Sequence, residues 1–163
     1  MPLESRGIFY YTMVIDTNTM ELRDHQKKIT QLMTTETKGK ILVPTGGGKT
    51  MCMIHDAKWR FSIPVPQTIV VVAPRILLAN QLCSEFLEHI DNVSVCHVHS
   101  GDTHHFKTTK PKQIQEWYHK TVKNILIFTT YHSLHRVQEA IDVEVDTIYF
   151  DEAHNSVQKN FLP

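Results

Sequence analysis

The sequence predicts an α/β protein whose mostly parallel sheet carries helices on both faces. Strand-like apolar runs alternate with helix-like segments along nearly all of the 163 residues, and this alternation is typical of doubly wound folds with right-handed crossovers. The run 69–73 is apolar at every position, as strands are when helices cover both faces of a parallel sheet. The length fits one domain, residues 1–163, and a chain of this size can bury a substantial core.

The elements follow from the spacing of apolar residues along the chain. Short apolar, β-branched or aromatic runs predict strands over 8–15, 41–43, 69–73, 93–98, 125–128 and 145–150. Helical spacing and helix-end signals predict helices over 21–33, 49–61, 75–90, 111–121 and 131–141, with another beginning at Asp151. Lys38-Gly39 is expected to end the first helix, and the polar segments 62–67 and 100–110 are expected to be loops.

The strongest chemical signal lies between a predicted strand and a predicted helix, in the run Pro44-Thr45-Gly46-Gly47-Gly48-Lys49-Thr50. This is the context of a phosphate-binding P-loop. Glycines let the backbone N–H groups turn toward a phosphate, and the helix N-terminus favours negative charge. Lys49 can reach the β- and γ-phosphates of ATP, and the Thr50 hydroxyl can ligate Mg²⁺. Val43 stands where the strict pattern has glycine, so a flexible loop with a solvated lysine is the alternative.

Two carboxylates, Asp151 and Glu152, follow the apolar run 148–150 directly. In open α/β sheets, ligands bind outside the carboxyl ends of the strands. Asp151 can hold Mg²⁺ through a water, and Glu152 can orient or deprotonate the water that attacks the γ-phosphate. The alternative is that both acids merely favour the start of the next helix through its dipole.

Taken together, these motifs resemble superfamily 2 helicases, and most of all the DEAH-box branch of restriction and DNA-repair enzymes. Segments 44–50 and 151–154 resemble its motifs I and II. Segment 73–81 resembles motif Ia, and segment 129–134 a further strand-contacting motif; segment 22–26 resembles the adenine-reading element. The resemblance implies a RecA-like P-loop NTPase lobe, ATP and Mg²⁺ as cofactors, DNA rather than RNA as the partner, and a cytoplasmic location.

The resemblance also implies roles for individual residues. Gln26, helped by Arg23, would hydrogen-bond the adenine, and His154 would couple the ATP site to nucleic acid or to the partner lobe. The residues expected to contact the nucleic-acid backbone are Pro74, Arg75, Thr130 and Ser133. Each has a simpler alternative: Gln26 as an ordinary polar helix residue, Pro74 as a helix start, Arg75 and His154 as solvated first-turn residues, and Thr130 as a strand end.

The same resemblance implies that the lobe is incomplete. Superfamily 2 enzymes hold ATP between two RecA-like lobes, and the second lobe supplies arginine fingers to the transferring phosphoryl group. In the family, a strand carrying a Ser-Ala-Thr motif follows the DEAH box and lies between the P-loop strand and the DEAH strand. Only nine residues follow His154. We therefore expect a sheet truncated after the DEAH strand, with two unpaired strand edges, and weak turnover at most.

Composition excludes several classes of function. Lys plus Arg and Asp plus Glu are 17 each, so nucleic acid would be bound by a local basic patch and not by a global field. Three cysteines without CxxC spacing are expected to be reduced thiols. No apolar run approaches the length of a membrane span, and no secretory signal opens the chain.

Eleven histidines are many for this length. Several of them, with one cysteine, lie within ten positions: Cys96, His97, His99, His104 and His105. Strand geometry places His97 and His99 on one face and Cys96 on the other. The run lacks ligand pairs at zinc-finger spacing, so solvated or core histidines are expected in preference to a structural metal.

Two other classes of function remain open from the residues alone. One is a different P-loop enzyme, such as a kinase or a RecA-like recombinase, which phosphate transfer to a small acceptor would reveal. The other is a non-catalytic module that holds nucleotide or nucleic acid for a partner, which restoring the second lobe would distinguish.

Overall fold

The computed structural model describes residues 7–14, 38–44, 48–141 and 144–151, and side chains within 48–141 and 144–151. Several predictions fall outside these residues: the helix 21–33 with Arg23 and Gln26, the loop positions Thr45, Gly46 and Gly47, and the DEAH positions Glu152 and His154. Among the described residues, no helix is long and apolar enough to cross a membrane.

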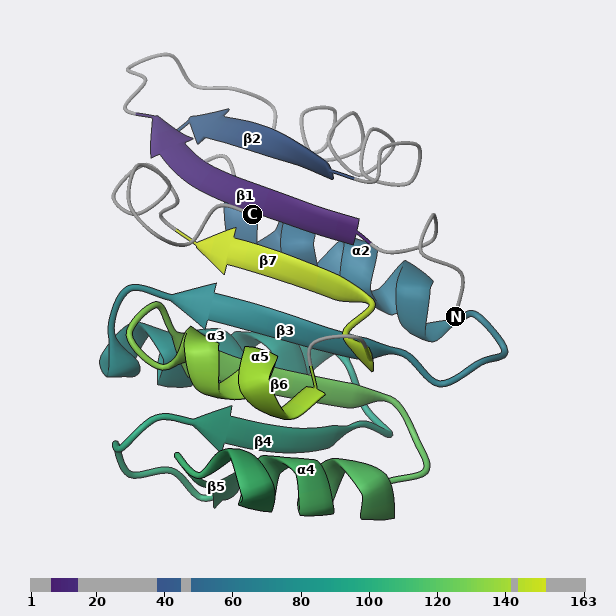
Figure 1. Ribbon diagram of the computed structural model, residues 1–163. Helices are drawn as coiled ribbons and strands as arrows, with labels where there is room; N and C mark the ends of the chain where they lie inside the picture. The colour runs from purple at the N-terminus through teal and green to yellow at the C-terminus, as the bar shows by residue number, and fades with distance from the viewer. Residues whose placement is uncertain (1–6, 15–37, 45–47, 142–143, 152–163) are drawn as a thin grey trace.

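The fold is built on one seven-stranded sheet with the order β2-β1-β7-β3-β6-β4-β5. Every pair of neighbouring strands in it runs parallel, and Figure 1 shows the strands pointing the same way. The strands are β1 (Gly7–Val14), β2 (Lys38–Pro44), β3 (Thr68–Ala73), β4 (Ser94–Val98), β5 (Phe106–Lys107), β6 (Ile125–Thr130) and β7 (Thr147–Asp151). The expected α/β architecture is therefore confirmed.

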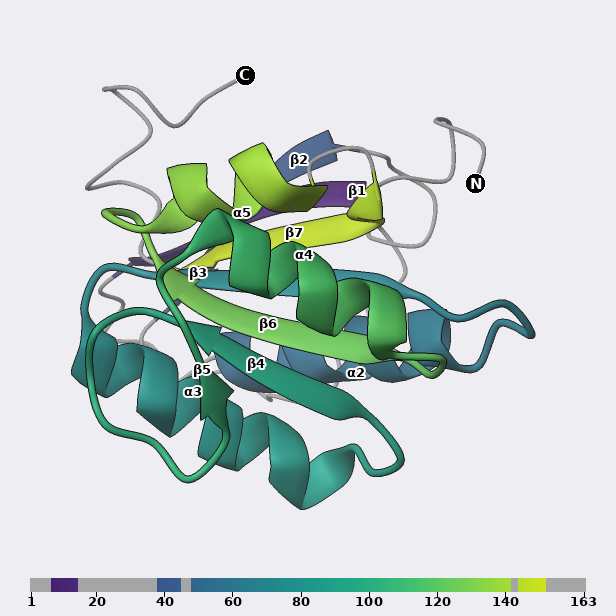
Figure 2. The same cartoon turned by 60° about the horizontal axis from the view of Figure 1, so that its bottom comes forward.

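Helices cover both faces of the sheet. Helices α2 (Lys49–Phe61) and α3 (Ile76–His89) lie on one face, and α4 (Pro111–Lys120) and α5 (Leu134–Ile141) lie on the other (Figures 1 and 2). The described strand-to-helix connections are short, which suits right-handed crossovers between parallel strands. The sheet is thus the middle layer of three, and the carboxyl ends of all its strands meet at one edge.

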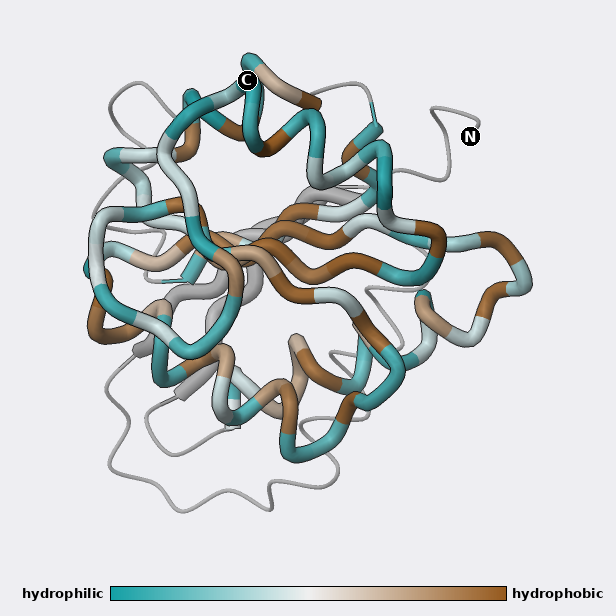
Figure 3. Tube along the Cα trace, turned by 90° about the horizontal axis from the view of Figure 1, so that it is seen from below, coloured by the Kyte–Doolittle hydropathy of each residue, from teal (hydrophilic) through white to brown (hydrophobic). Residues whose placement is uncertain are grey.

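Strand β3 lies at the centre of the core. All six of its residues are buried, and alternate side chains enter two separate apolar clusters. Ile69 and Val71 pack under α2 and α3, whereas Val70 and Val72 pack under α4 and α5. Figure 3 shows the hydrophobic colouring concentrated along the central strands. The prediction that this run is apolar because it is covered on both faces is confirmed.

The expected gap in the sheet is not present, because β1 fills it. β1 pairs with β2 over Ile8–Val14 and with β7 over Gly7–Tyr11. The predicted pair of open edges between the P-loop strand and the DEAH strand was wrong. The physical reason is that β1 pairs with both β2 and β7, at the position where a strand after the DEAH box is expected. The outer strands of the sheet are therefore β2 and β5.

Several element boundaries differ from the prediction, and three of these differences have an identifiable cause or bear on the site. Lys38 and Gly39 were expected to end a helix but begin β2, where pairing with β1 overrides the local glycine signal. The predicted polar loop contains β5, which pairs with β4 over only two residues and so gives no periodicity. Asp151 was expected to start a helix but is the last residue of β7.

Candidate functional site

The parallel sheet gathers separate sequence segments at one edge. β2 ends at Pro44, β3 at Ala73, β6 at Thr130 and β7 at Asp151. Ala73 and Thr130 are register partners, so the segments that follow β3 and β6 leave the sheet side by side. This is the edge at which open α/β sheets bind ligands.

A buried ion pair joins α2 to β7 at this edge. The Lys49 ammonium lies 2.8 Å from Oδ1 of Asp151, and the two side chains are 8% and 1% exposed. Their attraction is strong in a low dielectric, and leaving either charge alone there would be costly. A ligand that enters the pair must therefore offer each charge a new partner: an anion for Lys49 and a cation for Asp151.

The start of α2 is prepared for an anion. Gly48 precedes the helix with φ 71° and ψ 45°, a left-handed conformation that costs an L-residue roughly 1–2 kcal/mol and glycine little. Cys52 N donates to Gly48 O at 3.1 Å to close the first turn. The first turn has no acidic residue and no side-chain cap, so no side chain of that turn compensates the positive end of the helix dipole. Thr50 lies in this turn, half-buried.

Tyr131 is a positioning residue that the sequence did not single out. Its hydroxyl donates to the backbone carbonyl of Asp151 at 2.5 Å, and its amide donates to Ala73 O at 3.1 Å. Through its backbone amide and its hydroxyl together, this one residue after β6 links the ends of β3 and β7. The signal was available in the sequence, since a tyrosine directly after a strand can reach across the neighbouring strand ends.

The structure places the four predicted nucleic-acid contacts at the same edge, with different exposure. Arg75 is exposed and Pro74 half-buried, whereas Thr130 and Ser133 are each 5% exposed. The Ser133 amide donates to Thr130 Oγ1 at 3.3 Å, so both hydroxyl residues belong to the turn before α5. Pro74 does not start α3, because Arg75 is extended (φ −142°, ψ 154°) and the helix begins at Ile76.

A second buried ion pair lies further along α2. Arg60 Nε donates to Asp56 Oδ2 at 2.6 Å, and the Tyr149 hydroxyl of β7 donates to the same oxygen. Burial raises the pKa of Asp56, and the Arg60 guanidinium opposes that rise. Sequence analysis missed this network because Asp and Arg four positions apart are usually a solvated helix pair.

The histidines after β4 are partly core residues, as expected. His97 is 0% and His99 1% exposed, whereas His104 is exposed. Burial lowers the pKa of His97 to about 4, with further contributions from His99 and His105, so its imidazole is neutral at physiological pH. Cys96 faces the opposite apolar cluster, which confirms the predicted alternation along this strand.

The family described as "Type III restriction enzyme, res subunit" matches residues 19–162. The chain belongs to this family. The res-subunit family is helicase-like and of superfamily 2, so the resemblance drawn from the motifs is confirmed at the level of the family. The chain is a helicase-like ATPase module of this class.

One solved structure similar to this res-subunit chain is "Structure of a nuclease-deletion mutant of the Type ISP restriction-modification enzyme LlaGI in complex with a DNA substrate mimic". The match has a TM-score of 0.71 at 20% sequence identity, and it covers 85% of this chain and 15% of that one. It supports a RecA-like helicase fold. No curated protein sequence matches the chain.

Proposed function

We propose that this res-subunit chain is the ATP-binding lobe of an ATP-dependent helicase or translocase that moves on DNA. The observation that carries the proposal is the buried pair of Lys49 and Asp151, 2.8 Å apart where α2 begins and β7 ends. A lysine at an uncapped helix start and a carboxylate at a strand end are the two groups that a metal–polyphosphate complex requires.

Binding of Mg·ATP would exchange the partners of this pair. Lys49 would turn from Asp151 to the β- and γ-phosphates, and the loop that begins at Pro44 would offer the phosphates the backbone N–H groups of Thr45, Gly46, Gly47 and Gly48. Asp151, through a water, and Thr50 would then hold hydrated Mg²⁺. The exchange leaves neither buried charge unpaired, because the ligand supplies an anion and a cation together.

Hydrolysis requires groups beyond this pair. Glu152 would orient or deprotonate the attacking water, and Gln26 with Arg23 would bind the adenine. A second RecA-like lobe, as the family resemblance implies, would supply arginine fingers to the γ-phosphate. His154 would couple ATP binding and hydrolysis to the bound nucleic acid or to the second lobe.

DNA would cross the same edge of the sheet, next to the nucleotide. Pro74 and Arg75 follow β3, and Thr130 and Ser133 follow β6, its register neighbour. Exposed Arg75 offers the charge that phosphate contacts need. The DNA substrate mimic named for the similar Type ISP enzyme supports DNA as the partner in preference to RNA.

Calorimetric titration with Mg·ATP tests the nucleotide site. The Lys49→Ala variant should lose binding, whereas Lys58→Ala should keep it, because Lys58 is an exposed lysine of the same helix. The Asp151→Asn variant should bind ATP without the usual gain from Mg²⁺. Folding of each variant is checked by circular dichroism. Equal Mg·ATP affinity in folded Lys49→Ala would overturn the proposal.

The coupling to DNA is tested separately, with a second RecA-like lobe supplied to the chain. Single-stranded DNA should raise the rate of ATP hydrolysis more than RNA of the same length. ATP binding without any stimulated hydrolysis would instead indicate a non-catalytic module. Transfer of phosphate to a small acceptor would indicate a different P-loop enzyme.

A further inference from the structure

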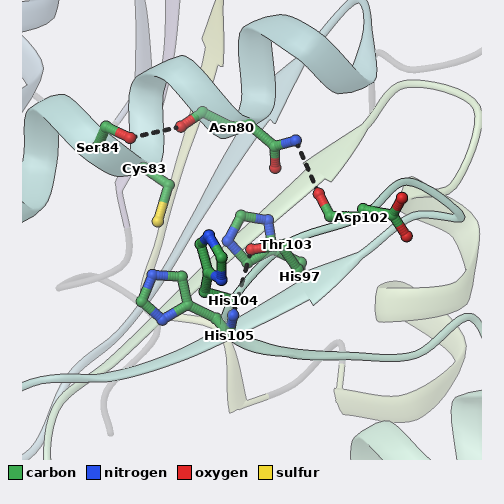
Figure 4. A pocket seen from close by; sticks show the side chains of 8 residues that line it. All are labelled: Asn80, Cys83, Ser84, His97, Asp102, Thr103, His104 and His105. Carbon is green, nitrogen blue, oxygen red and sulfur yellow. Dashed lines mark hydrogen bonds between the residues drawn. The ribbon is translucent and has the colours of Figure 1, made fainter.

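A cluster of thiol and imidazole groups lies beside the end of β4, on the α3 side of the sheet. β4 and the residue that follows it bring His97 and His99 to this face, α3 brings Cys83, and the loop 100–105 returns over them with His104 and His105. All members of this cluster except His99 line a cavity of about 300 Å³. Figure 4 shows the Cys83 sulfur pointing from the helix toward the imidazole rings.

Three groups of this cluster have the spacing of a metal site. One potential ligand atom from each of Cys83, His97 and His105 lies within 4.8 Å of the other two. Bonds of roughly 2.0–2.3 Å to tetrahedral zinc bring ligand atoms about 3.5 Å apart. Side-chain rotation would have to close that difference, and all three residues border the same cavity.

His105 is the side chain that must rotate. Its ring is stacked on His97, with centroids 5.6 Å apart and planes within 8°. Two stacked rings cannot both aim an in-plane lone pair at one ion, so one of them has to turn. His97 is packed between other rings and fully buried, whereas His105 is accessible on its loop.

A second observation points independently to a ligand. His97 is 0% exposed and lines the cavity, and its Nε2 atom has no hydrogen-bond partner. Buried polar atoms are satisfied in the great majority of cases, and the exceptions call for an explanation. Imidazole nitrogen and thiol sulfur together form a set of metal ligands that suits borderline-soft divalent ions such as Zn²⁺. The same set does not suit Mg²⁺, which binds oxygen ligands.

We propose that Cys83, His97 and His105 bind one zinc-class divalent ion, with water or His104 as the fourth ligand. On binding, the Cys83 thiol releases its proton to solvent and its sulfur bonds to the metal, while both imidazoles bind as neutral ligands. No redox partner is required. The site goes beyond the proposed nucleotide function and does not depend on it.

Metal binding would be coupled to the loop through His99. Without metal, the Gly101 amide donates to His99 Nδ1 at 3.0 Å, so the His99 proton is on Nε2 and faces His97 Nδ1 at 3.0 Å. The His97 proton is then on Nε2, where the metal would bind. Metal binding moves the His97 proton to Nδ1 and the His99 proton to Nδ1, which removes the acceptor of the Gly101 amide.

The position of the site suggests what the ion would do. Its ligands join α3 to the loop after β4, two segments already linked by a hydrogen bond from Asn80 Nδ2 to Asp102 O at 3.1 Å. α3 begins directly after Arg75. In the sheet order, β4 lies three strands from β7, or about 14 Å at the usual strand spacing. The ion would therefore fix the loop and helix beside the proposed DNA path, apart from the nucleotide.

Cobalt binding provides the test, because a thiolate–cobalt bond gives a charge-transfer absorption band in the near ultraviolet. Co²⁺ is titrated into the tag-free chain after treatment with a chelator. We expect one equivalent to produce the band, Zn²⁺ to remove it by displacing Co²⁺, and excess Mg²⁺ to leave it unchanged. The melting temperature should rise with Zn²⁺.

Matched variants assign the ligands. Cys83→Ser should abolish the band, and His105→Ala should weaken Co²⁺ binding by at least the roughly tenfold that loss of a mere outer-shell partner costs. Two control variants should leave the band and the Co²⁺ affinity unchanged. Cys52→Ser alters another buried thiol of the same core cluster, and His119→Ala alters an exposed histidine on α4. If Cys83→Ser does not fold, the accessible His105→Ala still tests the site. A folded chain without the band, or a band that survives Cys83→Ser or is unaffected by His105→Ala, would overturn the proposal.

Discussion

The two buried ion pairs of α2 invite comparison, because both connect this helix to β7. Lys49 pairs with Asp151 at the start of the helix, and Asp56 pairs with Arg60 two turns further on while accepting a hydrogen bond from Tyr149. Tyr149 and Asp151 are two residues apart on one strand, so they project from the same face of the sheet toward the same helix.

The pairs differ in where they lie relative to the strand ends. Asp56 and Arg60 lie along α2 under the body of the sheet, where Tyr149 of β7 donates to Asp56 and the two side chains are 0% and 6% exposed. Lys49 and Asp151 lie at the carboxyl edge, where the chain leaves the sheet. The same chemistry therefore stabilises the fold at one position and can exchange partners with a ligand at the other.

The largest expected effect comes from breaking the inner pair. Asp56→Ala would leave the Arg60 guanidinium in the core without this carboxylate, and we expect a loss of about 3–5 kcal/mol in the free energy of unfolding. Urea denaturation measures it. Glu88→Ala, at an exposed position of α3, should change stability by less than about 0.5 kcal/mol. A loss below about 1 kcal/mol for Asp56→Ala would show that the inner pair is not a structural anchor.

Replacing both members of each pair by apolar residues separates stability from binding. Lys49→Met with Asp151→Leu removes both charges, so stability should stay within about 1 kcal/mol of the wild type while Mg·ATP binding is lost. Asp56→Leu with Arg60→Met also removes the acceptor of Tyr149, so a deficit of about 1–3 kcal/mol should remain while binding persists. Nucleotide affinity and urea denaturation are measured on both double variants. If only the Asp56→Leu, Arg60→Met variant lost Mg·ATP binding, the inner pair and not the outer pair would be the one that exchanges partners with the nucleotide.

The sequence predicted the parts of this molecule that local patterns determine. Periodicity and turn chemistry predict three of these parts: the Lys49–Phe61 helix, the fully buried β3, and the alternation of Cys96 and His97. Once the strands are parallel, their carboxyl ends meet at one edge of the sheet, and no further sequence signal is needed to bring them there. The sequence placed Lys49 and Asp151 near strand ends, and the parallel sheet brings these two ends to one edge; the direct ion pair between the two side chains was not predicted.

What the sequence did not predict depends on contacts between distant segments. The position of β1 between β2 and β7 is decided by strand pairing, and the eight residues of β1 carry no signal of which strands will flank it. The ion pair of Asp56 and Arg60 looks like a solvated helix pair until β7 covers it. Likewise, Cys83 on α3 reaches the histidines only through the packing of helix on sheet, whereas the nearer Cys96 faces away.

The smallest expected effect tests how the outer pair is held in place. Tyr131→Phe removes only the hydroxyl that donates to the Asp151 carbonyl, and a typical loss is about 0.5–1.5 kcal/mol in the free energy of unfolding. Because that bond fixes the end of β7, the Mg²⁺-dependent part of ATP affinity should fall while affinity for ATP without metal stays unchanged. Tyr118→Phe, on α4 and away from this edge, is the control for removing a tyrosine hydroxyl. An equal fall in ATP affinity with and without Mg²⁺ would mean that Tyr131 supports the fold of this edge as a whole and does not position Asp151. In that case, α2 alone would hold the ion pair of Lys49 and Asp151 in place.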